Sequence, residues 1–238
     1  MLPPRPTLDA VCLDAGNTLV GMEWAHLLPL LADAGIAATP AALARAEAAA
    51  RPSHSRRLAG GRSSEAAEAA VFQVAAILQG LGVANADATE RAPRLARRIR
   101  AEVPSRRLWS RVLPGVPEAL AAMRAAGLRL VVVSNSDGTV EALLGDVGLR
   151  DAVDAVVDST HVGAEKPDPA IFAHALRHAG TAPERALHVG DLHAVDVVGA
   201  RAAGLHAVLL DPHGDWGDVD CAVVPDVSAL ARALLGDA

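Results

Sequence analysis

The sequence predicts an α/β fold in which a doubly wound parallel sheet carries an inserted bundle of α-helices. Short runs rich in β-branched residues alternate with amphipathic helical patterns, as in parallel strands joined by crossover helices. One long segment, 21–110, is rich in Ala, Leu, Glu and Arg and contains no convincing strand run. The 238 residues are 51% hydrophobic, enough for a core with a smaller insertion. We therefore expect a core domain formed by 1–20 and 111–238, and a helical cap domain over 21–110.

The strands of the core are predicted from short apolar runs bounded by turn residues. The first run ends on Asp14 and the second on Ser134, so polar side chains follow the strands directly. We expect six strands, over 8–14, 128–134, 153–158, 186–190, 206–210 and 221–224.

The helices between these strands are predicted from their ends. Asp168 and Pro169 place a capping side chain before a proline at the first helical position, and Gly180 follows the last apolar turn. The other helices likewise end at a glycine. We expect helices over 116–126, 168–179, 194–203 and 227–235.

The 21–110 segment is predicted to form a small helical bundle. Glycine and proline residues divide it, at Gly35, Pro52, Gly60–Gly61, Gly80–Leu81–Gly82 and Pro93. Because the segment follows the first strand directly, we expect it to lie as a lid over the ligand-binding edge of the sheet.

Composition excludes several classes of function. A net charge of -6 and few aromatic residues (three Trp, two Phe and no Tyr) argue against nucleic-acid binding. No apolar run approaches the roughly 20 residues of a membrane span, and residues 1–6 are too short and proline-rich for a signal peptide. With two widely separated cysteines, we expect a reduced, cytoplasmic protein, monomeric or homodimeric, without a membrane partner.

Polar residues suited to catalysis follow four of the predicted elements. Asp14 ends the first strand, Ser134 and Asn135 end the second, and Asp191 follows Gly190. Lys166, in the loop before a predicted helix, is the only lysine in the chain. Because the carboxyl ends of parallel strands meet at one edge of a sheet, we expect these residues to lie close together.

These residue types suit phosphoryl transfer. The Asp14 carboxylate can attack phosphorus, and Lys166 and Ser134 can bind phosphoryl oxygens. Asp14 and Asp191 are the hard oxygen ligands that Mg²⁺ prefers. Asp196 could bind the ion through water or orient Asp191, although a solvated or salt-bridged acid fits its helical position better.

The order of these motifs resembles the haloacid dehalogenase superfamily of hydrolases over nearly the whole chain. Asp14–Thr18 is similar to its first motif, Ser134 to the second, Lys166 to the third and Asp191–Asp196 to the acidic fourth. The helical insertion resembles the first type of cap, typical of subfamily I. The resemblance implies a Rossmann-like core and a Mg²⁺-dependent phosphatase acting on a small phosphorylated metabolite through an aspartyl-phosphate. It implies that the catalytic residues are Asp14, Ser134 and Lys166. It implies that the substrate is bound by Asn17, Thr18, Ser134, Asn135 and Lys166. It implies that the metal is bound by Asp14, Asp191, Asp196 and the Gly16 carbonyl.

Gly16 departs from this pattern, because phosphatases of the family usually carry an aspartate there that protonates the leaving group. Such general acid–base help contributes about 10²–10⁴-fold. Three interpretations stay open: a phosphatase restricted to good leaving groups, a metal-independent 2-haloacid dehalogenase, and a phospho-ligand-binding protein with impaired turnover. A phosphonatase would need a cap lysine, which 21–110 lacks. Glu23, His26 and His54 are weak candidates to replace the missing acid.

Overall fold

The computed structural model describes residues 7–59 and 62–236, and it contains the predicted six-stranded parallel sheet. The strand order is β5-β4-β1-β6-β7-β8. The chain passes from β1 to β4 and β5 on one side and then to β6, β7 and β8 on the other, so the end of β1 lies where the winding reverses. The strands are β1 (Ala10–Leu13), β4 (Arg129–Ser134), β5 (Ala155–Asp158), β6 (Ala186–Gly190), β7 (His206–Leu210) and β8 (Ala222–Val224). All six predicted strands are confirmed, within two residues at each end.

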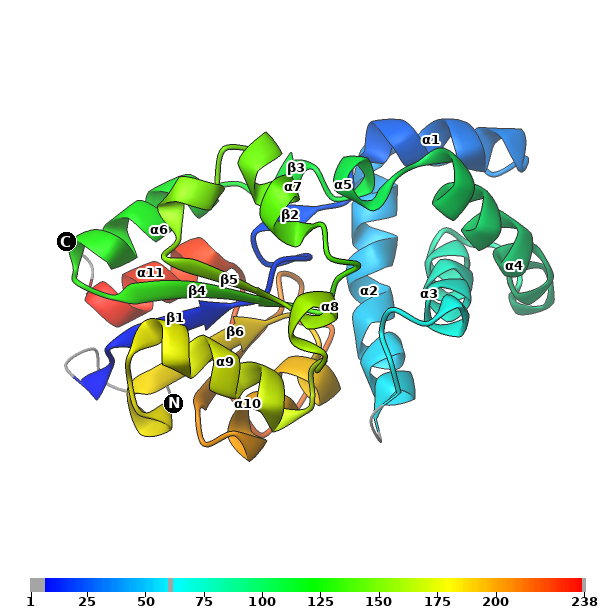
Figure 1. Cartoon of the computed structure of the whole chain (residues 1–238). Helices are drawn as coiled ribbons and strands as arrows, with labels where there is room; N and C mark the ends of the chain where they lie inside the picture. Colours follow the sequence, from blue (N-terminus) through cyan, green and yellow to red (C-terminus); the bar gives the residue numbers. More distant parts are fainter. Residues whose placement is uncertain (1–6, 60–61, 237–238) are drawn as a thin grey trace.

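Helices cover both faces of the sheet (Figure 1). They are α6 (Val116–Ala125), α7 (Val140–Asp146), α8 (Ser159–Val162), α9 (Pro169–Ala179), α10 (Val198–Ala202) and α11 (Val227–Leu235), with short turns at Arg150–Ala152 and Pro183–Arg185. Side chains alternate along the strands: Val11 and Leu13 pack in the cluster that contains α6, α7 and α11, whereas Ala10 and Cys12 pack with α9 and α10. The doubly wound fold class is therefore confirmed.

The helical cap region lies between two very short strands, β2 (Val20–Gly21) and β3 (Arg111–Val112), which pair antiparallel. Its helices are α1 (Trp24–Asp33), α2 (Pro40–Leu58), α3 (Ala67–Gly80), α4 (Asn85–Glu102) and α5 (Ser105–Leu108). They share a hydrophobic cluster separate from those of the sheet. Figure 1 shows α2 beside the ends of the central strands, with α3 and α4 beyond it.

The predicted helix breaks at Pro52 and Pro93 are wrong. Both residues lie inside continuous helices, α2 and α4. A proline removes one backbone donor, but packing of the whole helix against its neighbours outweighs that local cost. The predicted break at Gly60–Gly61 and residues 1–6 lie outside the described residues.

The predicted helix over 194–203 begins differently from expectation. His193–Val197 forms a π-helical turn before α10 continues it. This π-helical turn begins two residues after Asp191, at the carboxyl edge of the sheet where the candidate residues gather. Within the described residues, no helix is both long and apolar enough to cross a membrane.

Candidate active site at the carboxyl edge of the sheet

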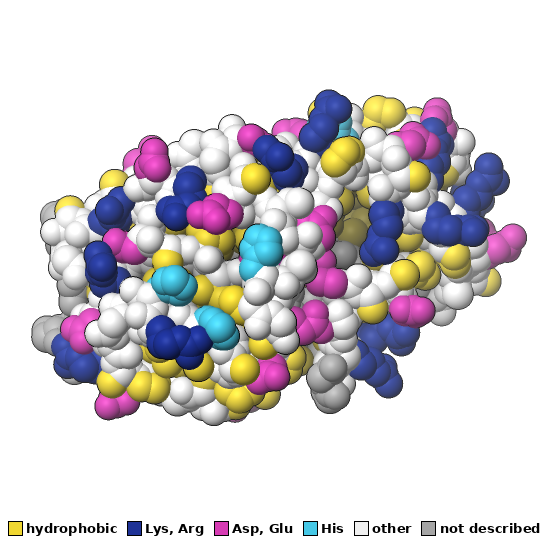
Figure 2. Space-filling model, in the orientation of Figure 1, with side chains coloured by type: hydrophobic (Ala, Val, Ile, Leu, Met, Phe, Trp, Pro, Cys, Tyr) yellow, Lys and Arg dark blue, Asp and Glu magenta, His cyan; other side chains and the backbone are white. Residues whose placement is uncertain are grey.

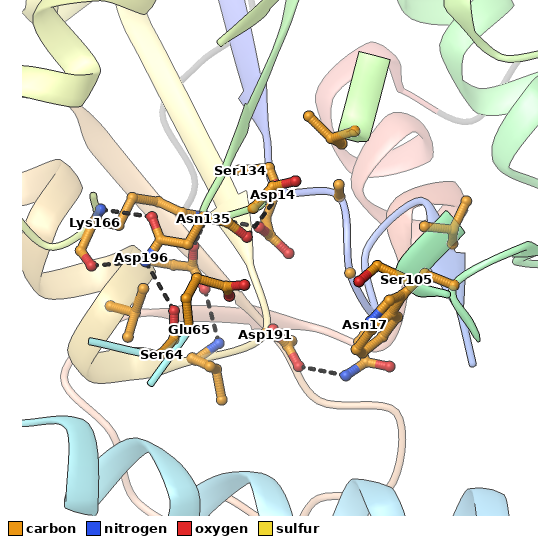
Figure 3. A pocket seen from close by; sticks show the side chains of 18 of the residues that line it. Asp14, Asn17, Ser64, Glu65, Ser105, Ser134, Asn135, Lys166, Asp191 and Asp196 are labelled. Carbon is orange, nitrogen blue, oxygen red and sulfur yellow. Dashed lines mark hydrogen bonds and ion pairs between the residues drawn. The ribbon is translucent and has the colours of Figure 1, made fainter. Parts of the chain in front are cut away.

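The strand ends bring most of the predicted site residues around one cavity of about 180 Å³. Asp14, Ser134, Lys166 and Asp191 all line it, although they are far apart in the sequence. The cap contributes the opposite wall, including Arg51 of α2. Figure 3 shows Asp14 close to Ser134, and the Asp191 carboxylate directed toward Asn17. Gly16, Asn17, Asn135 and Asp196 also line the cavity, whereas Thr18 does not.

Lys166 is the centre of a buried ionic network. Its ammonium donates to Asp14 Oδ1 at 2.6 Å and to Asp196 Oδ1 at 2.7 Å. The second oxygen of Asp196 accepts the Leu192 backbone N–H at 2.9 Å, and its first oxygen lies 3.0 Å from His188 Nε2. Both oxygens of Asp196 are therefore engaged by protein groups, which suits it to orient Lys166.

Burial and charge act against each other in this network. Burial lowers the pKa of Lys166, but Asp14 and Asp196 outweigh it and raise that pKa above its usual value. Burial raises the pKa of Asp196, but Lys166 and the His188 hydrogen bond outweigh it and hold that pKa below the usual range. For Asp14 burial prevails over Lys166, and its pKa is raised. Lys166 is thus held charged between two carboxylates.

The Lys166 loop is positioned by Asn135. The Lys166 backbone N–H donates to Asn135 Oδ1 at 2.7 Å, and Asn135 Nδ2 donates to the Lys166 carbonyl at 2.9 Å. The same amide donates to Ser64 of the cap at 3.0 Å. Asn135, predicted to bind substrate, therefore has its side-chain amide engaged in holding the loop. Among the described residues, Ser134 Oγ has one hydrogen bond, to the neighbouring Asn135 carbonyl at 3.3 Å, so it is available to a ligand.

Asp191 is tied to the cap through Asn17 and Arg51. Asn17, whose φ of 53° is left-handed, donates from Nδ2 to Asp191 Oδ2 at 3.0 Å and to Glu47 Oε1 at 2.9 Å. Arg51 pairs with Glu47 at 2.6 Å and lies 3.4 Å from Asp191 Oδ2. Burial raises the pKa of Asp191 to about 8, with Asp14 adding to the effect and Arg51 opposing it. The cap therefore reaches the acid that the sequence assigned to metal binding.

Thr18 lies beneath the nucleophile candidate. Its hydroxyl is 3.4 Å from Asp14 Oδ2, and its side chain is buried. This contact orients the Asp14 carboxylate and leaves the Thr18 hydroxyl away from the cavity.

Carboxyl groups outnumber cationic side chains in the lining of the cavity, and this donor set suits a divalent cation. Its charged lining residues, among those described, are two cations, Arg51 and Lys166, and six acids, Asp14, Glu47, Glu65, Asp137, Asp191 and Asp196. A phosphate dianion would be repelled by this set unless a cation were added. Asp14 and Asp191 supply oxygen donors of the kind Mg²⁺ prefers. The donor chemistry therefore fits the predicted ion.

The space beside Gly16 is filled by Trp109. A Cβ atom built on Gly16 would lie 3.4 to 3.7 Å from three carbons of the indole ring. Trp109 follows α5, and it packs against both the core and the cap clusters. An apolar ring thus lies in van der Waals contact with the position from which the missing acid would extend.

The structure distinguishes among Glu23, His26 and His54, the three candidates to replace that acid. Glu23 caps α1 by accepting the Ala25 N–H at 3.2 Å, and neither Glu23 nor His26 lines the cavity. His54 does line it. Its ring stacks on Phe72, and burial lowers the pKa of His54 to about 4. His54 is therefore neutral at neutral pH and carries no proton to donate as an imidazolium.

Sequence reasoning missed Glu47, Arg51 and Trp109. The four-residue spacing of Glu47 and Arg51 on one helix indicates an ion pair. The spacing does not indicate that this pair faces the site. His188, which lies in β6, is fully buried, and its ring packs edge-to-face with Phe172 with the ring centroids 5.0 Å apart.

Comparison with known proteins identifies the family. A model of the haloacid dehalogenase-like hydrolase family matches residues 8–204. The chain belongs to this family. It is accordingly a member of a hydrolase enzyme family, as the motif order predicted.

Curated relatives of this hydrolase match over part of their length. Human haloacid dehalogenase-like hydrolase domain-containing protein 3 is 46% identical over 99 residues, which are 42% of this chain and 39% of the relative. Phosphoglycolate phosphatase of Rhodospirillum rubrum is 38% identical over 133 residues, 55% of each chain. Glyceraldehyde 3-phosphate phosphatase of Methanothermobacter thermautotrophicus is 34% identical over 133 residues, 52% of this chain and 59% of the relative. The chain therefore spans about half the length of the curated relatives it matches.

Solved structures share the fold of this hydrolase. The HAD-hydrolase YfnB of Bacillus subtilis, bound to magnesium, has a TM-score of 0.64 at 19% identity and covers 95% of this chain and 98% of its own. L-2-haloacid dehalogenase of Xanthobacter autotrophicus has a TM-score of 0.60 at 20% identity, covering 97% and 100%. At such identities the likeness concerns the fold.

Proposed function

We propose that the chain is a Mg²⁺-dependent phosphatase of small phosphorylated metabolites, with Asp14 as nucleophile. The observation that carries this proposal is the Asp14–Lys166–Asp196 network facing a cavity with an excess of acids. Two curated relatives are named as phosphatases. A phosphatase that works through an aspartyl-phosphate needs a carboxylate nucleophile and cations around the transferred group, and this cavity offers both.

The reaction has two balanced steps. An Asp14 carboxylate oxygen bonds to phosphorus while the bond from phosphorus to the leaving oxygen breaks. Water then attacks phosphorus, phosphate departs, and the Asp14 carboxylate is regenerated, with the water proton passing to solvent. Lys166 stays charged between Asp14 and Asp196, so it neutralises the attacking carboxylate and a phosphoryl oxygen. Ser134 Oγ donates to another phosphoryl oxygen.

Magnesium would be held by Asp14, Asp191 and the Gly16 carbonyl. When bound, it would supply positive charge to the phosphoryl oxygens. Asn17 and Arg51 hold Asp191 in place.

The absence of an acid at Gly16 limits the substrate. With glycine at position 16 and Trp109 beside it, the position from which the family's acid would protonate a departing alkoxide carries no carboxyl group. Leaving groups that depart as anions, such as the carboxylate of an acyl phosphate, need no such proton. We therefore expect acyl phosphates and other anhydrides to be hydrolysed faster than alkyl esters.

The test is phosphate release from acetyl phosphate and a panel of phosphorylated metabolites, with Mg²⁺ and with EDTA. Release that requires Mg²⁺ and is lost in Asp14→Asn supports the proposal. Absence of release from every compound would overturn it, and tight Mg²⁺-dependent binding of beryllofluoride would then indicate a phospho-ligand-binding protein. Chloride release from 2-chloropropionate in EDTA would indicate a dehalogenase.

A further inference from the structure

A second cavity, of about 500 Å³, lies inside the cap and joins the candidate active site. Apolar residues from α1, α2, α3 and α4 line its interior. They include Leu27, Leu31, Leu43, Val74, Ile77 and Ile99. We call this space the cap cavity. Its size and lining match those of small-molecule sites, which are mostly apolar with a few polar groups.

The two cavities adjoin each other. Seven residues border both of them, namely Ser64, Glu65, Gln73, Ser105, Trp109, Asp137 and Thr139. Figure 3 shows Ser64, Glu65 and Ser105 around the same opening as Asp14. In Figure 2 the hollow between the core and the cap has hydrophobic side chains at its floor and charged side chains around its rim. A molecule bound at Asp14 can therefore extend into the cap cavity past Trp109.

The polarity of the combined space changes from one end to the other. The 180 Å³ end holds Asp14, Lys166 and Asp191 and is small for a whole ligand. At the other end Val74 and Ile99 are half-buried although they belong to the cap cluster. The cap thus leaves apolar side chains uncovered beside a charged site, and this arrangement fits a molecule that is charged at one end and hydrocarbon at the other.

We propose that the cap cavity binds the hydrocarbon chain of the substrate, which is a phosphate group carried on a medium-length acyl or alkyl chain. This inference rests on the proposed phosphatase function. The phosphate lies at Asp14, the bond that breaks lies beside Gly16 and Trp109, and the chain lies among the apolar side chains of α3 and α4. Acyl phosphates satisfy both features, because their leaving carboxylate needs no proton.

The first experiment measures kcat/KM for acetyl, hexanoyl and decanoyl phosphate with Mg²⁺. Each methylene transferred from water into an apolar site is expected to raise kcat/KM by about fourfold until the cavity is full. We expect hexanoyl phosphate to exceed acetyl phosphate by at least about tenfold. Equal values for all three compounds, with acetyl phosphate hydrolysed, would overturn the inference and leave the proposed function intact.

Variants test whether the cap cavity causes this preference. Ala96→Phe places a ring in the cavity, whereas Ala101→Phe makes the same change on an exposed position of α4 outside it. Ala96→Phe is expected to reduce the ratio of hexanoyl to acetyl activity to within about twofold, and Ala101→Phe is expected to leave it unchanged. Val74→Phe provides a second filling variant should Ala96→Phe fail to fold. An unchanged ratio in a folded filling variant would overturn the assignment.

Binding measured without turnover separates this inference from the proposed function. Calorimetry with decylphosphonate and methylphosphonate in Mg²⁺ should show tighter binding of the longer compound and a more negative heat-capacity change. If no phosphate ester or anhydride is hydrolysed but this preference is present and lost in Ala96→Phe, the function fails and the chain-binding site stands. Equal binding of the two phosphonates would overturn the site.

Discussion

The edge of the sheet and the interior of the cap differ in how completely they are filled. At the edge, Lys166 is 2% exposed, and its ammonium lies between two carboxylates at hydrogen-bond distance. Inside the cap, Val74 and Ile99 are only half-buried and border a cavity of about 500 Å³. Burying a charge without a partner costs much free energy, whereas apolar side chains can line an open cavity until a ligand covers them. The site at the edge of the sheet is therefore filled by paired charges, whereas the cap retains an unfilled apolar space that could hold part of a substrate.

Removing the proposed nucleophile should break this comparison most strongly. We expect Asp14→Asn to lower the rate of phosphate release from acetyl phosphate by at least about 10⁴-fold, because the amide that replaces the proposed nucleophile cannot attack phosphorus. Calorimetric binding of decylphosphonate should still be measurable, since the cap cavity is unchanged. Retained turnover would assign the attack to another group.

Removing the ammonium should reduce stability as well as activity. Lys166→Met leaves Asp14 and Asp196 buried without their cation, a change expected to lower the free energy of unfolding by about 3–5 kcal/mol. Urea unfolding measures this. The control is Arg45→Met, which removes an exposed ion pair between the cap and Asp215 and should cost less than about 1 kcal/mol. Similar losses in both variants would show that the buried network is no more important than a surface pair.

Lowering the pH should reduce the free energy of unfolding through His54, which lines the candidate active-site cavity. Its folded pKa, about 4, lies below the ordinary value of 6.5 because burial disfavours the charged ring. The unfolded chain therefore binds the proton more readily, and the contribution of His54 is fully present above pH 6.5 and is lost as pH falls toward 4. The loss is expected to reach about 3 kcal/mol. Urea unfolding across this window should show a shallower acid loss in His54→Phe than in the parent, and identical slopes would contradict the assignment.

The contact between Gly16 and Trp109 predicts a paired effect. Gly16→Asp alone should raise activity on alkyl phosphates little, because the indole ring lies against the new Cβ atom and restricts how the carboxyl group can turn. Combined with Trp109→Ala, Gly16→Asp should raise it by about 10²-fold over Trp109→Ala alone, within the range for a general acid. Kinetics of all three variants on one alkyl phosphate measure the coupling. A full gain from Gly16→Asp alone would show that Trp109 does not limit the site.

The sheet and its active edge were predictable because they depend on local patterns. The apolar runs before Asp14 and Ser134 mark strands, and parallel topology then brings their ends together. The assignments of Asp14, Lys166 and Asp191 to catalysis and metal binding remain predictions that the variants above test. Pro52 and Pro93 show the limit of local patterns, since packing kept both inside helices.

By itself, the sequence determined the family, the order of the strands along the chain and the presence of Gly16 where related phosphatases usually have an aspartate. These follow from residue types and their spacing, which need no knowledge of distance. Only the tertiary structure decided that Arg51 reaches Asp191, that Trp109 lies against Gly16, and that the cap cavity adjoins the site. Those features depend on the rotation and separation of whole helices, and such quantities are set by packing among distant residues rather than by any local pattern.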